Sequence, residues 1–548
     1  MKEFTNGQPI ALADIPLYEY SSFADTLTTE VSKGRRINAF FGMAREEHVE
    51  VFAILSDDNL GCLMAGRSLI QGDSFPSLTP QCPQIHLFER ELAEQFGLKA
   101  QGHPWFKPVR YIPSFTGKDA WGRPVGEPIL PAVGDFFRIE GEQVHEVAVG
   151  PVHAGVIEPG HFRFQCYGEK VYHLEIALGF QHRGIEGALM GGPDNRTLHY
   201  METLAGDTTI GHATTYSQIL EALTHREVSP RAQLLRGIAL ELERLANHIG
   251  DLGALSGDVG FLPTMSFCGR IRGEVLNMTA LLCGNRFGRG FIVPSGTGFD
   301  VDSKEVEELL HRLSANERDS LDAINLLWEN QSVMARFEDT GPLPQDVARI
   351  MGIVGPAARA TGLARDVRLT HPTGVYRITQ IPVATYHTGD VFARAYVRFL
   401  EVQHSFAFIR NQLNSLLNNP DEPPGSGKAD PGGDSAKTQK SPLDQEAFHS
   451  RENSLNKKRA PNPELSAILG VAPTLEPDRL AVVLNEGWRG EICHVAITDP
   501  KGRIARYKVV DPSFHNWTAL ALVLRNQEIS DFPLCNKSFN LSYCGHDL

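Results

Sequence analysis

The amino-acid sequence predicts an α+β protein, in which a small α/β block precedes a larger, mainly helical block that contains a β-hairpin. Three observations support this prediction. Short apolar runs with the length of strands lie near the N-terminus, apolar residues recur with helical spacing through the centre, and a turn with Pro and Gly joins two strand-like runs near the C-terminus. A chain of 548 residues exceeds one ordinary hydrophobic core, so we expect two or three domains.

The N-terminal block contains three strand-like runs and one helix. Residues 37–43, 49–56 and 61–67 are short and apolar, which is typical of buried strands. Residues 87–98 fit a helix that ends near Gly97, because glycine readily takes the left-handed conformation common at helix ends. The sequence therefore predicts a small mixed sheet-and-helix unit.

One amphipathic helix, predicted over residues 231–252, dominates the central block. Its apolar side chains step by three and four residues and form one stripe, made of Leu235, Ile238, Leu242, Leu245 and Ile249. Four polar residues fall off this stripe, namely Glu241, Arg244, Asn247 and His248. With Asp258, some of these residues could relay protons, or they could form a structural hydrogen-bond network.

Two further local signals mark element ends. Asp302 is expected to cap a helix, with Glu305 three residues later as the second half of a capping box. The residues "DPKG" separate the strand-like residues 491–498 from 503–510, which predicts a hairpin.

Two polar segments predict connections. Residues 111–135 are rich in Gly and Pro and fit an extended connector. Residues 418–463 contain almost no apolar side chains, so burial cannot offset their ordering entropy, and we predict a disordered insertion.

Composition excludes several classes of function. The formal net charge of −14 argues against non-specific nucleic-acid binding, which needs a basic surface. No apolar run reaches the length of a membrane span, and the first residues lack the layout of a signal peptide, so we expect a cytosolic chain. The eight cysteines include no CxxC pair, which argues against zinc or iron–sulfur sites built from local pairs. Without a Rossmann fingerprint, we expect no nicotinamide cofactor on this chain.

One stretch near residue 160 concentrates polar side chains. His153 and His161 stand on a Gly/Pro-rich turn before a strand, and His182, Arg183 and Glu186 begin a helix on which the last two can pair. These residues fit a buried, hydrogen-bonded loop with a surface ion pair. They also fit a polar cavity wall that supplies a proton acceptor and an anion-holding cation.

Six motifs in one order resemble a known family. They are "GPVHAGVIEPGHFRF", "LGFQHRGIEGAL", "ELERLANHIGDLGALSGDVG", "GNRFGRGFIVPSG", "GPAARATGLARDVR" and "GDVFARAYVRFLEVQHS", and the match continues from "EGWRGEICHVAITDP" to "DPSFHNWTAL". This series resembles the catalytic large subunit of membrane-bound (group 4) nickel–iron hydrogenases and the quinone-site subunit of respiratory complex I. Residues 88–111 resemble the small peripheral-arm subunit that pairs with the latter.

The resemblance implies a fusion of those two subunits, as in formate hydrogenlyase. Its domains would be a small complex I-like domain over residues 1–120, a linker over 121–145, and a hydrogenase-large-subunit-like domain over 146–548 that contains the insertion. The larger domain would be mainly helical with β-hairpin elements.

The nickel-binding cysteines of the family are missing here. In the hydrogenases two CxxC pairs hold nickel, the first within "RxCGxC" and the second after "DP". Here Thr203, Ala205 and Thr208 stand at the arginine and the first two cysteines, while Gly206 and His212 are kept. At the second pair stand Ser513 and Asn516. A nickel–iron centre needs thiolates, so the sequence predicts no metal site of this kind.

The complex I side of the resemblance implies a quinone headgroup near a histidine. By motif His161, or less surely His153, takes that position, whereas Leu204 and Ala205 stand where a tyrosine is expected. Arg359, Asp366 and Arg368 could line the same cavity or lock two segments by salt bridges.

The resemblance therefore implies a soluble-arm subunit of an energy-converting complex, peripheral on the cytoplasmic side of the inner membrane. It would bind two kinds of partner, a small iron–sulfur subunit and membrane antiporter-like subunits. The cluster of the iron–sulfur subunit would pass electrons to a cavity that holds a quinone or another non-metal acceptor. Catalytic roles are expected for His161, Arg183, Glu186 and His212, and cofactor contacts for His153, Glu158, Ala205, Thr208, Ser513 and Asn516. The alternatives are a nickel–iron hydrogenase with unusual ligands and a non-catalytic scaffold.

Overall fold

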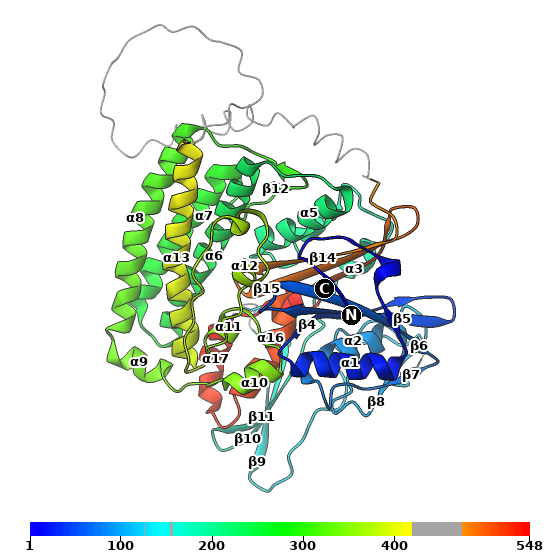
Figure 1. Cartoon of the computed structure of the whole chain (residues 1–548). Coiled ribbons are helices and arrows are strands. Elements are labelled where there is room, and N and C mark those ends of the chain that lie inside the picture. Colours follow the sequence, from blue (N-terminus) through cyan, green and yellow to red (C-terminus); the bar gives the residue numbers. More distant parts are fainter. Residues whose placement is uncertain (125, 154–156, 419–473) are drawn as a thin grey trace, which may run out of the picture.

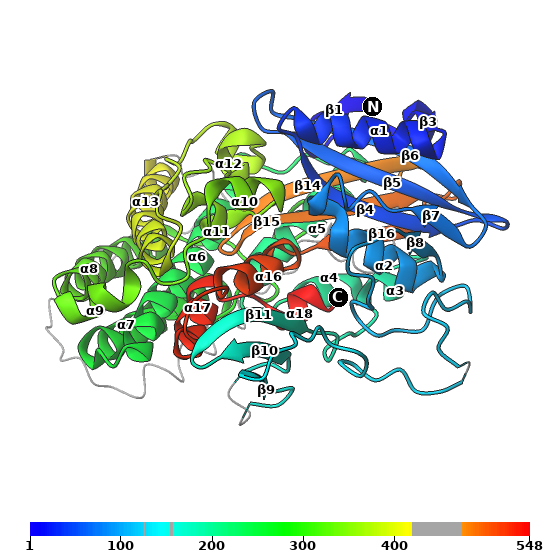
Figure 2. The same ribbon diagram turned by 90° about the horizontal axis from the view of Figure 1, so that it is seen from below.

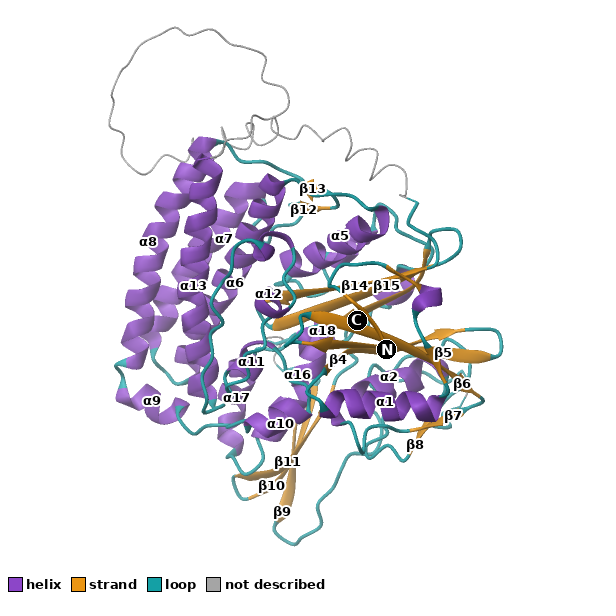
Figure 3. Ribbon diagram, viewed as in Figure 1, coloured by secondary structure: helices purple, strands orange, loops and turns teal. Residues whose placement is uncertain are grey.

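The computed structural model describes residues 1–124, 126–153, 157–418 and 474–548. A helical bundle, two sheets at its side and a smaller three-stranded sheet below form the molecule (Figures 1 and 2). Helices and strands both make large contributions, which confirms the mixed class (Figure 3). The predicted disordered insertion lies, from residue 419 on, outside the described residues.

The N-terminal sheet contains the three predicted strands, β4 (Arg36–Ala44), β5 (His48–Asp57) and β6 (Cys62–Gln71). They pair antiparallel in the order β1-β6-β5-β4, with β1 (Lys2–Phe4) at the edge and β3 (Leu17–Tyr18) parallel to β6. Helices α1 (Tyr20–Ser32) and α2 (His86–Phe96) belong to the same block. The predicted end of α2 is confirmed, because Gly97 takes a left-handed φ of 67°.

The second sheet joins the two ends of the chain. Its order is β16-β15-β14-β2, where β14 (Arg479–Gly487), β15 (Gly490–Thr498) and β16 (Ile504–Val510) follow one another and β2 (Ile10–Ala11) comes from the N-terminal block. The β15–β16 hairpin confirms the "DPKG" turn.

One hydrophobic core lies under both sheets. It contains Phe40 and Phe52 of the N-terminal sheet together with Val482, Val495 and Phe514 of the C-terminal region. The N-terminal block is thus packed directly on the second sheet, and the division into the proposed domains stays a prediction.

The bundle consists of four long helices, namely α6 (Pro230–Asp258), α7 (Leu262–Cys283), α8 (Ser303–Trp328) and α13 (Val391–Asn418). The predicted apolar stripe of α6 is buried, and the capping box at the start of α8 is confirmed. The four polar residues off the stripe are buried as well, because α6 is covered by α7 and α13, and Glu241 and Arg244 form an ion pair.

The third sheet stands apart from the other two. Strands β9 (Val144–Val149), β10 (His161–Tyr167) and β11 (Lys170–Ala177) are antiparallel, and α16 (Pro512–Val523) and α18 (Tyr543–His546) lie beside them (Figure 2). The described part of residues 111–135 forms no helix or strand, as an extended connector should.

Shorter elements complete the chain. They are β7 (Ser74–Pro76), β8 (Lys99–Gln101), α3 (Ile185–Ala188), α4 (Thr197–Met201), α5 (Thr209–Thr224), β12 (Ile292–Val293), β13 (Gly296–Thr297), α9 (Gln331–Phe337), α10 (Gln345–Ile350), α11 (Gly355–Arg359), α12 (Val367–Thr370), η3 (Gly374–Arg377) and α17 (Phe532–Phe539). Within the described ranges, no helix is both long and apolar enough to cross a membrane.

The contact between α11 and the β14–β15 turn yields a stability prediction. Gly355 has a φ of 66°, and a Cβ there would lie 2.1 Å from the carbonyl oxygen of Arg489. We expect Gly355→Ala to lower the free energy of unfolding by about 2 kcal/mol or more, since both the backbone conformation and the space exclude the methyl group. Gly206→Ala is the matched control, because no atom of the described residues lies within 4 Å of its Cβ position. Equal denaturation midpoints for the two variants would contradict the prediction.

Candidate functional site

The loop before α5 is the segment in which the family carries its first cysteine pair. Ala205 is buried, and Thr208 is held by hydrogen bonds. The Thr208 Oγ1 accepts from Trp488 Nε1 at 3.1 Å and from Arg489 Nη1 at 3.3 Å. Arg489 also pairs with Asp207 at 2.6 Å. The Thr208 hydroxyl therefore fastens this loop to the turn between β14 and β15.

His212 belongs to a fully buried chain of polar side chains. Its Nε2 lies 3.0 Å from Asp511 Oδ2, and its Nδ1 lies 3.1 Å from His494 Nε2. The His494 Nδ1 in turn lies 2.8 Å from the Tyr507 hydroxyl. None of these four side chains is more than 1% exposed. We call the set the Tyr507–Asp511 relay.

Protonation states in the relay follow from its surroundings. Burial, with His212 nearby, holds the pKa of His494 well below its usual range, so His494 is neutral. Burial would raise the pKa of Asp511, but the hydrogen bond and charge of His212, with Arg489, outweigh burial and lower it. An ionised Asp511 accepts from His212 Nε2, and His494 joins His212 to the Tyr507 hydroxyl. The four side chains therefore form one continuous hydrogen-bonded chain that ends at Asp511, and burial holds the pKa of Tyr507 well above its usual range.

The second cysteine pair is also replaced by groups with structural hydrogen bonds. The Ser513 backbone N–H donates to Asp511 Oδ1 at 2.8 Å, and the Ser513 Oγ accepts from the backbone N–H of Ser542 at 2.9 Å. The Asn516 side chain pairs with the backbone N–H and C=O of Val354, each at 3.1 Å. Both side chains are buried, and both hold segments together.

The expected pair of Arg183 and Glu186 does not form. Arg183 donates to the carbonyl oxygens of Thr203 and Leu204, at 2.7 and 2.9 Å. The sequence prediction is wrong because α3 begins only at Ile185, after Gly184 with a left-handed φ of 66°, so Arg183 lies outside the helix.

Glu186 is buried and pairs with the second sheet instead. Lys508 Nζ and Arg506 Nη2 each lie 3.0 Å from its carboxylate. Burial opposes ionisation, yet these cations and Arg110 lower the pKa of Glu186 to about 2. This carboxylate is thus a permanent charge that fixes α3 to β16 rather than a group that exchanges protons.

The loop with the two histidines is only partly described. His161 begins β10, and its Nε2 accepts from Arg163 Nε at 3.3 Å, while the Phe136 ring lies 5.2 Å from its own. Burial lowers the pKa of His161, so its ring is neutral near pH 7. His153 is exposed, and it precedes residues 154–156, which are outside the described residues.

Residues 540–548 fill the space between these segments. The Tyr543 N–H donates to Glu158 Oε2 at 3.3 Å, and the Asp547 carboxylate accepts from the N–H groups of Gly179 and Gln181 at 2.8 and 3.0 Å. Gly545 packs so closely on Asp511 that a Cβ would lie 2.7 Å from its carboxyl carbon. The segments of Glu158, Arg183, Ala205 and Ser513 thus lie together, with packed chain between them among the described residues.

Sequence reasoning missed the partners of His212. His494, Tyr507 and Asp511 lie within motifs that carried the resemblance, but nothing in their spacing marks a hydrogen-bonded chain. Strand alternation could have placed His494 on one face of β15, but its contact with α5 depends on how the sheet packs.

The residues present do not fit a nickel–iron centre. Ala205 has no ligand atom, and Thr208, Ser513 and Asn516 offer only hard oxygen or amide groups that are already hydrogen-bonded. Six of the eight cysteines are buried away from the loop, and Cys62 and Cys544 are half-buried and single. In the part of the chain that the structure describes, no group of three or more His, Cys, Asp or Glu residues is arranged to hold a metal.

Residues 258–547 match the family model described as the 49 kDa subunit of respiratory-chain NADH dehydrogenase. The chain belongs to this family. The match spans α7, α8, α13 and the strands β14 to β16, so it includes His494, Tyr507 and Asp511 of the Tyr507–Asp511 relay.

Curated relatives extend the 49 kDa-subunit family match toward the N-terminus. Formate hydrogenlyase subunit 5 of Escherichia coli is 26% identical over 90% of this chain and 81% of its own length. The carbon monoxide-induced hydrogenase of Rhodospirillum rubrum is 29% identical over 72% of this chain and 97% of its own. An NADH-quinone oxidoreductase subunit of Herpetosiphon aurantiacus is 26% identical over 70% and 94%. The suspected relationship to both hydrogenases and complex I is thus confirmed.

The relay yields a prediction about acid stability. Because the folded pKa of Asp511 lies below its ordinary value, the ionised carboxylate contributes stability above that value, and this stability is lost as the pH falls through the folded pKa. We expect Asp511→Asn to lower the free energy of unfolding at pH 7 by about 3 kcal/mol and to flatten the acid side of the stability profile. The exposed Asp25→Asn is the control. Parallel pH profiles for the wild type and Asp511→Asn would refute the assignment.

Proposed function

We propose that this chain is a peripheral subunit of a membrane-bound, energy-converting oxidoreductase complex, and that electrons reach its site without a nickel–iron centre. One observation supports the proposal above all: the four ligand positions hold Ala205, Thr208, Ser513 and Asn516, while the relay around His212 is complete. The proton-handling part of the site is kept, and the metal-binding part is replaced.

The proposed electron acceptor is a quinone. Its support is the neutral His161 and the aromatic Phe136 against it. Phe136 also lines a cavity of about 640 Å³, together with Trp105, Phe137 and His173. A flat ring could stack on these aromatic side chains, and the His161 ring lies 5.2 Å from that of Phe136.

Residues of this chain would transfer protons and hold the loop with Ala205 in place. The Tyr507–Asp511 relay would provide a hydrogen-bonded path for protons, and Arg183 anchors the loop that contains Ala205 through its two carbonyl bonds. The quinone, when bound, supplies the redox chemistry. No residue of this chain needs to change its oxidation state.

Partner subunits would cover the side of the third sheet. The connector and the loop before β10 expose large apolar side chains, with 58% of Leu130, 67% of Val133, 52% of Phe137 and 75% of Val152 accessible. Such a concentration favours a protein interface. We propose a small iron–sulfur subunit there, antiporter-like membrane subunits beyond it, and a position on the cytoplasmic side of the inner membrane.

A non-catalytic scaffold is the second candidate, and one observation favours it. Residues 540–548 pack between the wall segments, so the place of the metal in relatives is filled by protein. A hydrogenase with unusual ligands gains no comparable support, because the four replaced positions are poor ligands.

Metal analysis tests the proposal directly. In the purified complex we expect iron from a partner's cluster and no stoichiometric nickel, because no thiolate pair is present to bind it. Stoichiometric nickel bound to this subunit, with hydrogen uptake, would overturn the proposal in favour of the hydrogenase.

Substitution at His161 separates catalysis from scaffolding. We expect His161→Ala to lower quinone reduction by the intact complex about tenfold or more, because the imidazole beside Phe136 is lost. His225→Ala is the matched control, since His225 is an exposed histidine whose ring bonds Glu476 rather than a residue of β10. An unchanged rate in an intact complex would favour the scaffold.

A further inference from the structure

A second set of charged side chains is buried between the helical bundle and the second sheet. None of its charged members is more than 3% exposed. It comprises three arginines, Arg244, Arg359 and Arg368, four carboxylates, Glu241, Asp366, Glu401 and Glu486, and one histidine, His248. We call it the carboxylate–arginine cluster. The sequence left open whether Arg359, Asp366 and Arg368 line a cavity or lock two segments by salt bridges. In the structure they form salt bridges.

The arginines each bridge carboxylates of different elements. Arg368 lies 3.1 Å from Glu241 and 2.6 Å from Asp366. Arg359 lies 2.6 Å from Glu401 and 2.7 Å from Glu486. In this way α6, α11, α13 and β14 are joined through one continuous network.

The charges of the cluster do not balance when all its acids are ionised. Three positive charges face four negative charges, which leaves one net negative charge without contact to solvent. Such a charge costs several kcal/mol in a buried site unless a proton neutralises it. A single bound proton restores neutrality.

The surroundings do not supply the missing positive charge. Arg398 is paired with Asp251 at 3.0 Å, and Arg489 with Asp207 at 2.6 Å, so each forms a neutral pair. Burial lowers the pKa of the neighbouring His404, which leaves it neutral.

Glu486 is the member that can hold the proton. Burial lowers the pKa of His248, so its ring is neutral and its Nε2–H donates to Glu401 Oε2 at 2.7 Å. On β14, burial raises the pKa of Glu486 to about 7, against the opposing effect of Arg359, and Asp366 adds to the rise.

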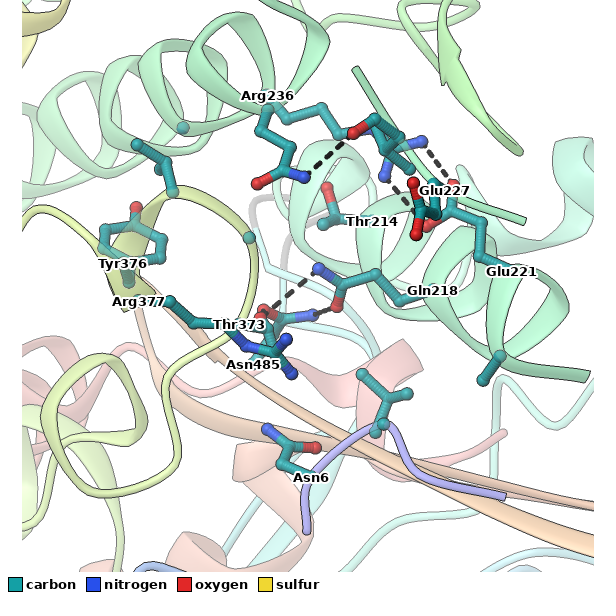
Figure 4. A pocket seen from close by; sticks show the side chains of 18 of the residues that line it. Asn6, Thr214, Gln218, Glu221, Glu227, Arg236, Thr373, Tyr376, Arg377 and Asn485 are labelled. Carbon is teal, nitrogen blue, oxygen red and sulfur yellow. Dashed lines mark hydrogen bonds and ion pairs between the residues drawn. The ribbon is translucent and has the colours of Figure 1, made fainter. Parts of the chain in front are cut away.

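Tyr376 gives the cluster a connection to solvent. Its hydroxyl donates to Glu241 Oε1 at 2.7 Å. Tyr376 also lines a cavity of about 620 Å³ between α5, α6 and η3, together with Gln218, Thr373 and Asn485, which are hydrogen-bonded to one another (Figure 4). Tyr376 therefore lies between Glu241 and the wall of this cavity.

The turn between β14 and β15 links the cluster to the candidate site. Arg244 donates to the carbonyl oxygens of Glu486 and Gly487, at 2.7 and 2.9 Å. Trp488 packs edge-on to the His248 ring at 6.2 Å and donates to Thr208. One turn therefore contacts the cluster on one side and the loop before α5 on the other.

We propose that the carboxylate–arginine cluster is a proton-storage site, which holds one exchangeable proton that enters through Tyr376. Its charge acts on the loop of Thr208 through the β14–β15 turn. The storage of the proton does not depend on the proposed redox function, because charge balance alone requires it.

Glu486→Gln tests the charge count. The amide oxygen can still accept from Arg359, while three positive charges now face three negative ones. We expect the folded full-length variant to bind one proton fewer than the wild type near pH 6, in a potentiometric titration between about pH 5 and about pH 9. Since the folded pKa of Glu486 is raised, stability present below its unfolded value is lost as the pH rises through about 7, and the variant should lack this loss.

Glu221→Gln is the matched control. Glu221 forms a closed buried pair with Arg236, one charge of each sign, at 2.6 Å. This variant should lose stability because an arginine is left unbalanced, and its proton count over the same pH range should equal that of the wild type. An equal count for Glu486→Gln and the wild type would overturn the proposal.

Two further measurements keep the proposal testable if Glu486→Gln does not fold. In infrared spectra of the wild type, the band of a buried protonated carboxyl group should titrate near neutral pH, and its absence overturns the proposal. Tyr376→Phe should leave the equilibrium proton count unchanged and slow the uptake of the proton after a pH jump about tenfold or more. An unchanged rate would refute the role of Tyr376.

Discussion

Arg244 fixes the second sheet to the helical bundle, and the geometry of the candidate site depends on this contact. Its guanidinium group donates to two carbonyl oxygens of the β14–β15 turn and to Glu241. The turn ends the two strands that carry Glu486 and His494. Because hydrogen bonds to a buried charged group are directional and strong, the sheet has one position relative to α6. His494 reaches His212 only in that position.

The residues at the positions that correspond to the nickel ligands of the hydrogenases are packed and hydrogen-bonded. Thr208 fastens its loop to Trp488, and Asn516 ties α16 to the backbone of Val354. Each replacement satisfies buried backbone or side-chain groups, which would be costly to leave unpaired. Residues 540–548 take up the remaining room. The scaffold of the hydrogenase-related family is therefore compatible with a site that contains no metal.

Two buried polar systems share this scaffold but differ in charge. The Tyr507–Asp511 relay has one carboxylate, at the end of a continuous hydrogen-bonded chain. The carboxylate–arginine cluster has one carboxylate more than it has arginines. A proton-linked event in one system can act on the other, because the β14–β15 turn contacts both.

The sequence by itself determined the local elements and the absence of thiolate ligands. The strands β4 to β6, the helix α6, the cap at Asp302 and the β15–β16 hairpin follow from short-range periodicity and turn chemistry, which act between neighbours in the chain. Residue identity alone shows that Ala205 cannot bind nickel.

Only the tertiary structure decided which side chains meet. Arg183 was expected to pair with Glu186. Because Gly184 is left-handed, Arg183 donates to the carbonyl oxygen of Leu204 instead, and Glu186 forms an ion pair with Lys508 on β16. The same holds for His212 with Asp511 and for Glu486 with Arg359. Such contacts join residues far apart in sequence, and their formation depends on how sheets and helices pack, which no local pattern encodes.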